Sequence, residues 1–159
     1  MGMRVPPPGT RGSSSMTWAR RLFSPMFRLQ VAQYRHSRAT GQPKLIGLPA
    51  LLLTTVGRRS GRERTVPLGG FEDGPDAWLV VGSAGGGRQH PAWFLNMAAH
   101  PEQIWVEVGR RRLRVEAELL EGERRKNAYQ RLVGIFPRYQ GYQAKTDREV
   151  PVVRLTPAE

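Results

Sequence analysis

Residues 57–93 read GRRSGRERTVPLGGFEDGPDAWLVVGSAGGGRQHPAW, and the rest of the chain is organised around them. Two glycine-rich turns, at residues 57–64 and 83–91, enclose two short extended runs at 65–71 and 77–82, which we expect to pair as a β-hairpin. Both turns combine glycine, which allows close approach of the backbone, with arginine, whose planar guanidinium binds phosphate or carboxylate through two hydrogen bonds. The stretch therefore predicts one binding site for an anionic ligand, built from two loops of a small β-domain.

Positive charge is concentrated in the N-terminal third of the 159-residue chain. Residues 1–62 contain eleven Arg and Lys and no Asp or Glu, whereas residues 63–159 contain fourteen basic and thirteen acidic residues. This asymmetry predicts an anionic partner for the N-terminal part: a lipid surface, a phosphate-bearing ligand or a nucleic acid.

The composition argues against metal-binding and membrane-spanning functions. The chain has no cysteine, which excludes disulfides and thiolate metal sites, and His36, His90 and His100 lie too far apart for a zinc site. It also lacks a run of about 18 apolar residues, the length of a membrane-spanning helix, and its N-terminus lacks the apolar core of a secretory signal. We therefore expect no bound metal and a cytoplasmic protein.

The N-terminal 40 residues divide into two parts. Residues 1–16 are rich in Pro, Gly and Ser, and we expect them to be disordered because they carry too little apolar surface to fold. Residues 17–40 predict a basic amphipathic helical segment, with a helix from Pro25 to about His36 that begins after a Ser24 cap. This helix either packs its apolar face on the domain or lies on an anionic lipid surface.

Residues 41–159 have the pattern of one small antiparallel β-domain. Alternation is clearest at 104–108 and 113–119, which a short turn joins as a hairpin with one buried and one charged face. The other predicted strands and helices follow from apolar runs and Pro/Gly boundaries. They are strands at 50–56, 64–70, 78–82 and 150–155, and helices at 91–99 and 122–136. About six strands with few, short helices favour a mainly β, α+β fold, an antiparallel barrel with helices on its rim.

The two turns are the candidate binding elements. Arg58, Arg59, Arg62 and Arg64 lie within seven residues, and successive amides in a tight turn with arginines form an anion-binding nest. The alternative is a solvated hairpin end with chance charges. Three consecutive glycines at 85–87 are costly in backbone entropy unless a ligand needs that backbone, although a plain flexible loop has the same composition.

Few side chains offer catalysis by themselves. His90 has no carboxylate or nucleophile near it in the sequence, so a capping or packing role is favoured over acid–base chemistry. Ser83 is not in the context of a nucleophile elbow, and Glu116 and Glu118 fall on the charged, solvated face of a strand. A catalyst built from these residues would depend on a bound cofactor for its chemistry.

Three ordered motifs make the chain resemble a known family. They are LTTVGRRSG at 53–61, the segment from Ser83 through HPAWFLN at 90–96, and YQGYQAKT at 139–146. With these motifs the chain, from about Tyr34 to Leu155, resembles the deazaflavin-dependent nitroreductase family, actinobacterial reductases that use coenzyme F420. The resemblance implies a split β-barrel related to flavin-binding oxidase barrels. It also implies hydride transfer from the reduced cofactor to an electron-poor acceptor such as a quinone, an enone or a nitro compound.

The resemblance further implies which residues form the site. The residues that would hold the cofactor's phosphate and polyglutamate tail are Arg58, Arg59, Ser60, Arg62 and Arg64. The other cofactor-binding residues, most of them around the deazaflavin ring, would be Thr65, Pro67, Ser83, Ala84, Gly85, Gly86, Arg88, His90, Pro91, Ala92 and Trp93. The catalytic candidates that would face the substrate are Ser83, Tyr139 and Tyr142, with Tyr142 or water as the proton donor.

Several partners and interpretations stay open. In the family the N-terminal helix is often associated with the membrane, which implies a peripheral place at the inner face of the cell membrane through residues 17–38 and a lipophilic quinone as acceptor. A monomer and a homodimer both fit the sequence. The alternatives are a barrel that binds FMN or haem, a membrane-peripheral structural protein, and a basic nucleic-acid-binding barrel with aromatic side chains for stacking. Because the excess charge is confined to the N-terminal third, we expect no nucleic-acid partner.

Overall fold

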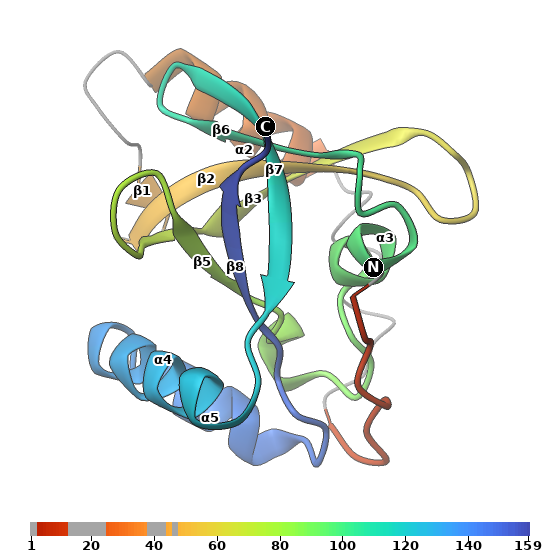
Figure 1. The fold of residues 1–159 in the computed structure, drawn as a ribbon, viewed down its shortest axis with the longest axis vertical. Helices are drawn as coiled ribbons and strands as arrows, with labels where there is room; N and C mark the ends of the chain where they lie inside the picture. Colours follow the sequence, from red (N-terminus) through yellow and green to blue (C-terminus); the bar gives the residue numbers. More distant parts are fainter. Residues whose placement is uncertain (1–2, 13–24, 38–43, 46–47) are drawn as a thin grey trace.

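A curled antiparallel sheet forms the body of the protein, with short helices around it (Figure 1). The computed structural model describes residues 3–12, 25–37, 44–45 and 48–159. Its strands are β1 (Lys44–Leu45), β2 (Leu48–Val56), β3 (Glu63–Gly69), β4 (Phe71–Glu72), β5 (Trp78–Val81), β6 (Ile104–Val108), β7 (Arg111–Leu119) and β8 (Val152–Pro157). Its helices are α2 (Pro25–Ser37), α3 (Ala92–Ala99), α4 (Gly122–Ile135) and α5 (Arg138–Lys145), with a 3-10 turn, η2 (Ala84–Gly86).

The strands pair in the order β1-β2-β6-β7-β8-β5-β4, with β3 added beside β2, and all these pairs are antiparallel. The predicted antiparallel barrel is therefore confirmed. The eight strands of the described residues include two, β1 and β4, that the sequence did not predict, because each has only two residues. Helix α5 was also not predicted.

The expected hairpin between residues 65–71 and 77–82 forms only next to its turn, where Phe71 and Glu72 of β4 pair with Leu79 and Trp78 of β5. The rest of the first run, β3, does not pair with β5. β3 pairs with β2, whereas β5 lies between β4 and β8. All four residues of β5 are buried, so this strand needs neighbours on both edges and cover on both faces. Residues 57–62 instead connect β2 to β3, at the end of a long hairpin that extends beyond the sheet toward α3 (Figure 1).

Three apolar clusters hold these elements together. The largest lies between the sheet and α3, and it includes Leu53, Phe94 and Met97, which are fully buried. A second cluster lies under α4 and α5 and is centred on Leu132. The third is small and joins α2 to the other face of β2 through Tyr34. α2 and α3 therefore lie on opposite faces of β2.

Helix α2 is fastened to the sheet by polar contacts. The Tyr34 hydroxyl lies 3.0 and 3.1 Å from the carbonyl oxygens of Ala50 and Glu107 and accepts a hydrogen bond from the Gly109 amide at 3.1 Å. Arg35 donates to both carboxylate oxygens of Glu107, at 3.1 and 2.9 Å. The predicted β6–β7 hairpin is confirmed, but its Glu107 is 6% exposed rather than solvated, because α2 covers it. Residues 17–24 and 38–40 of the predicted helical segment lie outside the described residues.

Residues 3–12 differ from the expected disorder, because they run as an extended segment along the domain (Figure 1). Met3 packs against the largest cluster. The Gly9 amide donates to the Arg88 carbonyl at 2.9 Å, and the Thr10 and Arg11 amides donate to an Asp147 carboxylate oxygen at 2.7 and 3.2 Å. Contacts with specific residues of the domain therefore order this segment, although it carries too little apolar surface to fold alone.

Replacing Asp147 with alanine is expected to release this segment. The carboxylate accepts three hydrogen bonds from Thr10 and Arg11, and these bonds lower the pKa of Asp147 to about 2. We expect trypsin to cleave after Arg11 several-fold faster in Asp147→Ala than in the native chain, because cleavage requires the detached state. The matched control is Glu118→Ala, which removes an exposed ion pair to Arg124 elsewhere. Equal cleavage rates in the two variants would contradict this account.

Candidate functional site

The arginine-rich turn is a compact end to the β2–β3 hairpin. The Gly57 amide donates to the Arg62 carbonyl at 2.8 Å, and the Gly61 amide donates to the Gly57 carbonyl at 2.8 Å. Gly61 has a φ of 69°, which a glycine adopts without strain. Ser60 Oγ accepts from the Arg62 amide at 3.2 Å, so this hydroxyl builds the turn.

The arginine side chains of this turn extend into solvent. Arg58, Arg59, Arg62 and Arg64 are all exposed. Within the described ranges, the guanidinium groups of Arg59 and Arg62 have no hydrogen-bond or ion-pair partner. Two unpartnered cations beside two others on a rigid hairpin end suit an extended polyanion.

Asn96 joins this turn to α3. Its side chain is 5% exposed, and its Oδ1 accepts from the Arg58 amide at 3.1 Å and from Arg58 Nη1 at 3.5 Å. Its Nδ2 donates to Thr55 Oγ1 at 3.5 Å. Asn96 was not among the predicted site residues, although a polar side chain within an otherwise apolar helix was a signal that could have found it.

The glycine-rich loop lies directly before the N-terminal end of α3. Ala84, Gly85 and Gly86 have φ values of 45°, 61° and 81°, and such a conformation is strained for alanine. A Cβ at Gly86 would lie 2.8 Å from the Tyr142 carbonyl oxygen and 2.9 Å from Lys145 Cβ, so the loop packs directly on α5. α3 thus connects the two predicted binding loops, one through Asn96 in its middle and the other at its N-terminal end.

Arg148 holds the inner side of this loop. Its side chain is 2% exposed, and Nε donates to the Gly87 carbonyl at 2.7 Å. Nη1 donates to the Gly82 carbonyl at 3.1 Å, and Nη2 to the Ser83 carbonyl at 2.8 Å. Sequence reasoning missed this residue, because an arginine in a charged segment at 147–149 is typical of a solvated surface.

His90 lies between Arg148 and the N-terminal segment. Its Nδ1 is 3.2 Å from Arg148 Nη1, which can only donate, so Nδ1 is the acceptor. Its Nε2 therefore carries the proton and donates to the Pro6 carbonyl at 2.9 Å. Burial lowers the pKa of His90, so the ring is neutral at pH 7 and both nitrogens have partners within the chain.

The two predicted catalytic tyrosines lie in different environments. Tyr139 is 7% exposed, within an aromatic cluster that includes Phe71 and Phe136, with ring centroids at 6.1 and 5.0 Å. Its burial raises its pKa above the ordinary value. Tyr142 is half-buried at the edge of this cluster, 6.2 Å from the Tyr139 ring. Tyr142 is therefore the more accessible of the two tyrosines.

Two predicted cofactor-binding residues, Thr65 and Pro67, lie on the face of the sheet that α2 covers and not on the face toward α3. Thr65 pairs with Thr54, and their hydroxyl oxygens are 2.8 Å apart, while Pro67 pairs with Leu52. Leu52 belongs to the small cluster with α2, so Thr65 and Pro67 face that side, in contrast to Val66. The structure therefore does not gather every predicted residue in one place.

The remaining predicted residues lie along the glycine-rich loop and the start of α3. Ser83 is half-buried, and Pro91 and Ala92 are half-buried where the helix begins. Arg88 is exposed, and its carbonyl accepts from the N-terminal segment. Trp93 is 5% exposed and packs against the Phe94 ring, so it is a core residue.

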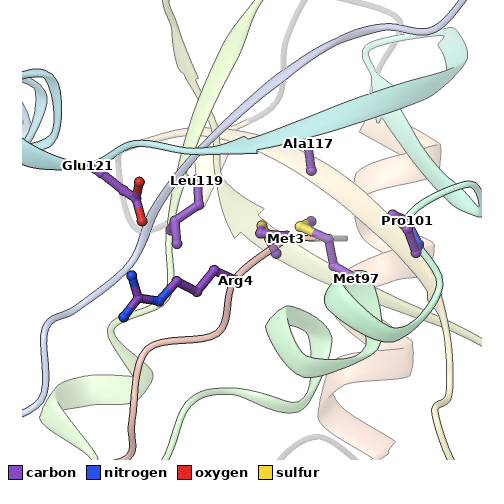
Figure 2. Close-up of a pocket in the computed structure, with 7 residues that line it drawn as sticks. All are labelled: Met3, Arg4, Met97, Pro101, Ala117, Leu119 and Glu121. Carbon is purple, nitrogen blue, oxygen red and sulfur yellow. The ribbon is translucent and has the colours of Figure 1, made fainter. Parts of the chain in front are cut away.

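A pocket of about 170 Å³ lies beside α3, away from both loops (Figure 2). Met3 and Met97 lie at its centre, and Arg4 and Glu121 lie together at one side. Its lining residues are Met3, Arg4, Met97, Pro101, Ala117, Leu119 and Glu121. None of them is a predicted site residue, so this pocket is distinct from the candidate site.

Neither a metal centre nor a membrane span is found in the part of the chain that the structure describes. No three His, Asp or Glu side chains there are grouped as metal ligands would be. Each helix in the same ranges is too short or too polar to cross a bilayer.

Comparisons with known proteins identify similar chains. Residues 26–157 match the model of the family described as F420H(2)-dependent quinone reductase. An F420H(2)-dependent quinone reductase of Mycobacterium tuberculosis is 36% identical over 137 residues, which are 82% of this chain and 89% of that protein.

Two solved structures are also similar. One is titled as an F420-H2 dependent reductase; it is 39% identical, with a TM-score of 0.60, and the match covers 67% of this chain and 93% of that one. The other is titled as a domain-swapped dimer; it is 34% identical, with a TM-score of 0.61, and covers 80% of this chain and 98% of that one.

Proposed function

Because the chain belongs to the F420H(2)-dependent quinone reductase family, we propose that its two loops, joined by α3, hold reduced coenzyme F420 for reaction with a quinone. The protein is an enzyme that transfers a hydride from reduced coenzyme F420 to a quinone. The observation that carries the assignment of the site is the cluster of four exposed arginines at the end of the β2–β3 hairpin.

The residues present fit a cofactor with a long acidic tail. Arg59 and Arg62 have guanidinium groups without partners in the described residues, and Asn96 fixes the backbone of Arg58 beside them. Such an arrangement binds phosphate and carboxylate groups through charge-assisted hydrogen bonds. At the N-terminal end of α3, the glycine-rich loop offers backbone to a flat ring at Gly85, which is half-buried and has no side chain to block the approach, whereas Gly86 packs on α5.

The bound cofactor supplies the hydride, and the chain's own residues orient the acceptor and handle the proton. We assign Ser83 and Tyr142, on the adjoining loop and helix, as donors to the developing oxygen charge of the quinone. Tyr142 or water delivers the proton. Tyr139 fits this role less well, because its side chain is buried among Phe71, Phe136 and Tyr142. Enones and nitro compounds are further acceptors to test.

Removing the arginines tests the proposed tail site. We expect Arg58→Ala/Arg59→Ala to raise the Kd for coenzyme F420 roughly 10- to 100-fold, because each charge-assisted hydrogen bond contributes about 1.5–3 kcal/mol before solvent screening. Fluorescence titration of the oxidised cofactor measures this Kd. Arg110→Ala, in the exposed β6–β7 turn, is the matched control and should bind as the native chain does.

An unchanged Kd for coenzyme F420 in the double variant would show that the acidic tail binds elsewhere. Saturable binding of FMN, haem or a short RNA in place of coenzyme F420 would contradict the proposed function itself. Family membership does not favour those alternatives.

Two finer assignments stay predictions. We propose that residues 17–38 contact the membrane surface. In this segment, Arg28 and Leu29 of α2 are exposed, and Leu29 is 58% exposed. The choice between monomer and homodimer is also open, and a domain-swapped dimer among similar structures makes the swapped dimer a form to look for.

A further inference from the structure

The guanidinium of Arg148 is committed to a single loop. Four N–H···acceptor contacts are made by its side chain, to the carbonyls of Gly82, Ser83 and Gly87 and to His90 Nδ1. A guanidinium has five N–H donors, so nearly all of its hydrogen-bonding capacity serves residues 82–90. Its own backbone is held from α5, where Gln143 Nε2 donates to the Arg148 carbonyl at 2.8 Å.

This buried charge has no counter-ion among the residues that the structure describes. Within the described ranges Arg148 forms no ion pair, since the flanking Asp147 bonds to the N-terminal segment and Glu149 pairs with Arg125. Burial lowers the pKa of Arg148 to about 10, which reflects the cost of keeping the cation there. A buried charge is retained only where hydrogen bonds compensate it, and here the loop carbonyls do so. The loop and Arg148 therefore depend on each other.

Without these hydrogen bonds the loop would not adopt its observed conformation. Ala84 has a φ of 45° and is followed by two glycines with positive φ. A non-glycine residue in the left-handed region costs about 1 kcal/mol or more and persists where surrounding contacts over-determine it. The carbonyls of Ser83 and Gly87, on either side of η2, are both bound to the same guanidinium.

We propose that Arg148 is the positioning residue of the glycine-rich loop, holding residues 82–90 in the shape that receives the deazaflavin ring. The identity of the ligand in this assignment rests on the proposed function. The claim that Arg148 holds the loop rests only on the contacts of Arg148 itself. Arg148 acts through the loop backbone and through His90, and it is not a catalytic residue. Its positive charge also lies against a loop assigned to an anionic cofactor, which favours binding.

Lysine cannot replace this arginine. Its ammonium is a point charge with three donors, whereas the three loop carbonyls and His90 Nδ1 are arranged around a planar fork. We expect Arg148→Lys to fold, and to raise the Kd for oxidised coenzyme F420 by about tenfold or more. The KM for the quinone, measured at saturating cofactor, should change less than the KM for the cofactor.

The matched control is Arg125→Lys. Arg125 is half-buried, donates to the Val150 carbonyl at 2.7 Å and to Gln143 Oε1 at 3.0 Å, and pairs with Glu149, but it does not contact the loop. Its replacement should lower the melting temperature as Arg148→Lys does, with the Kd for coenzyme F420 changed by less than about twofold. The split between stability and affinity separates positioning from a general structural role.

A second readout needs no cofactor. Nitrogen-15 NMR of the protein alone should show His90 protonated at Nε2 and not at Nδ1 in the native chain. In Arg148→Met, Nδ1 loses its donor, so the preference for this tautomer should weaken. If Arg148→Met does not fold, the same spectrum of Arg148→Lys, with its displaced donor, takes its place.

The outcomes separate the two claims. If the native chain binds coenzyme F420 while Arg148→Lys and Arg125→Lys bind it equally, the positioning role is refuted. A native His90 protonated at Nδ1 refutes it as well. If the native chain binds no coenzyme F420, the proposed function fails, and the His90 spectra of the variants still decide whether Arg148 holds the loop.

Discussion

Gly86→Ala is expected to disrupt the glycine-rich loop and its packing against α5. The added Cβ would lie 2.8 Å from the Tyr142 carbonyl oxygen, a backbone atom that cannot turn aside, and the φ of 81° is already unfavourable for alanine. Left-handed strain of about 1 kcal/mol and overpacking of about 1–3 kcal/mol together predict a loss of about 2–4 kcal/mol in the free energy of unfolding. Chemical denaturation measures this loss.

The same substitution should also separate η2 from α5 and so weaken binding of coenzyme F420 by about tenfold or more. Gly74→Ala is the matched control, because Gly74 has a similar φ of 91° but nothing within 4 Å of the added Cβ. It should cost about 1 kcal/mol and leave the affinity unchanged. Equal losses for the two variants would mean that the contact between η2 and α5 is looser than the structure has it.

Phe94→Ala is expected to give the largest loss of stability. Phe94 is fully buried between α3 and the sheet, with its ring 5.1 Å from His90 and 6.2 Å from Trp93. Removing a phenyl ring from such a site leaves a cavity and costs about 3–5 kcal/mol, which is a large part of the stability of a small domain. We expect the variant to melt well below the native chain, or to be recovered unfolded.

Ile135→Ala is the control for Phe94→Ala. Ile135 is also a large apolar residue on a helix, but it is 51% exposed, and its truncation should cost less than about 1 kcal/mol. A mild effect of Phe94→Ala, comparable with that of Ile135→Ala, would show that α3 is not part of the core. The link between the two loops would then lose its rigid support.

The parts of the fold that the sequence predicted are those with a regular pattern. The alternation of Val106 with Glu107 and of Val115 with Glu116 predicted the β6–β7 hairpin, and the apolar run of β2 predicted a buried strand. Which strands pair with one another was harder to predict. β5 pairs with β8, which lies about 70 residues later in the chain, and no local pattern encodes such a contact.

Short and irregular elements escaped prediction for a different reason. α5 has Gly141 near its middle and only eight residues, so its apolar period is too short to recognise. Residues 3–12 have the composition of a disordered tail, and their order comes from partners such as Asp147 and Arg88. Glu107 was expected in solvent because the position of α2 over β6 is a tertiary feature.

The candidate site shows the same division. The exposure of the arginine turn and the tight turn at Gly61 follow from residue types at fixed spacing. The opposite orientation of Thr65 relative to Arg64 follows from strand register, which became visible only with the pairing of β2 and β3. Arg148 was hidden because burial of an arginine depends on acceptors that lie about 60 residues away in the chain.

The most direct test of the central claim is the reaction itself. Purified protein is mixed with reduced coenzyme F420 and a water-soluble quinone, and the fluorescence of the oxidised cofactor is followed with and without enzyme. We expect enzyme-dependent oxidation of the cofactor that matches quinone consumption one to one and falls strongly in Arg58→Ala/Arg59→Ala. Quinone reduction that requires reduced FMN instead, or no cofactor oxidation at all, would contradict it.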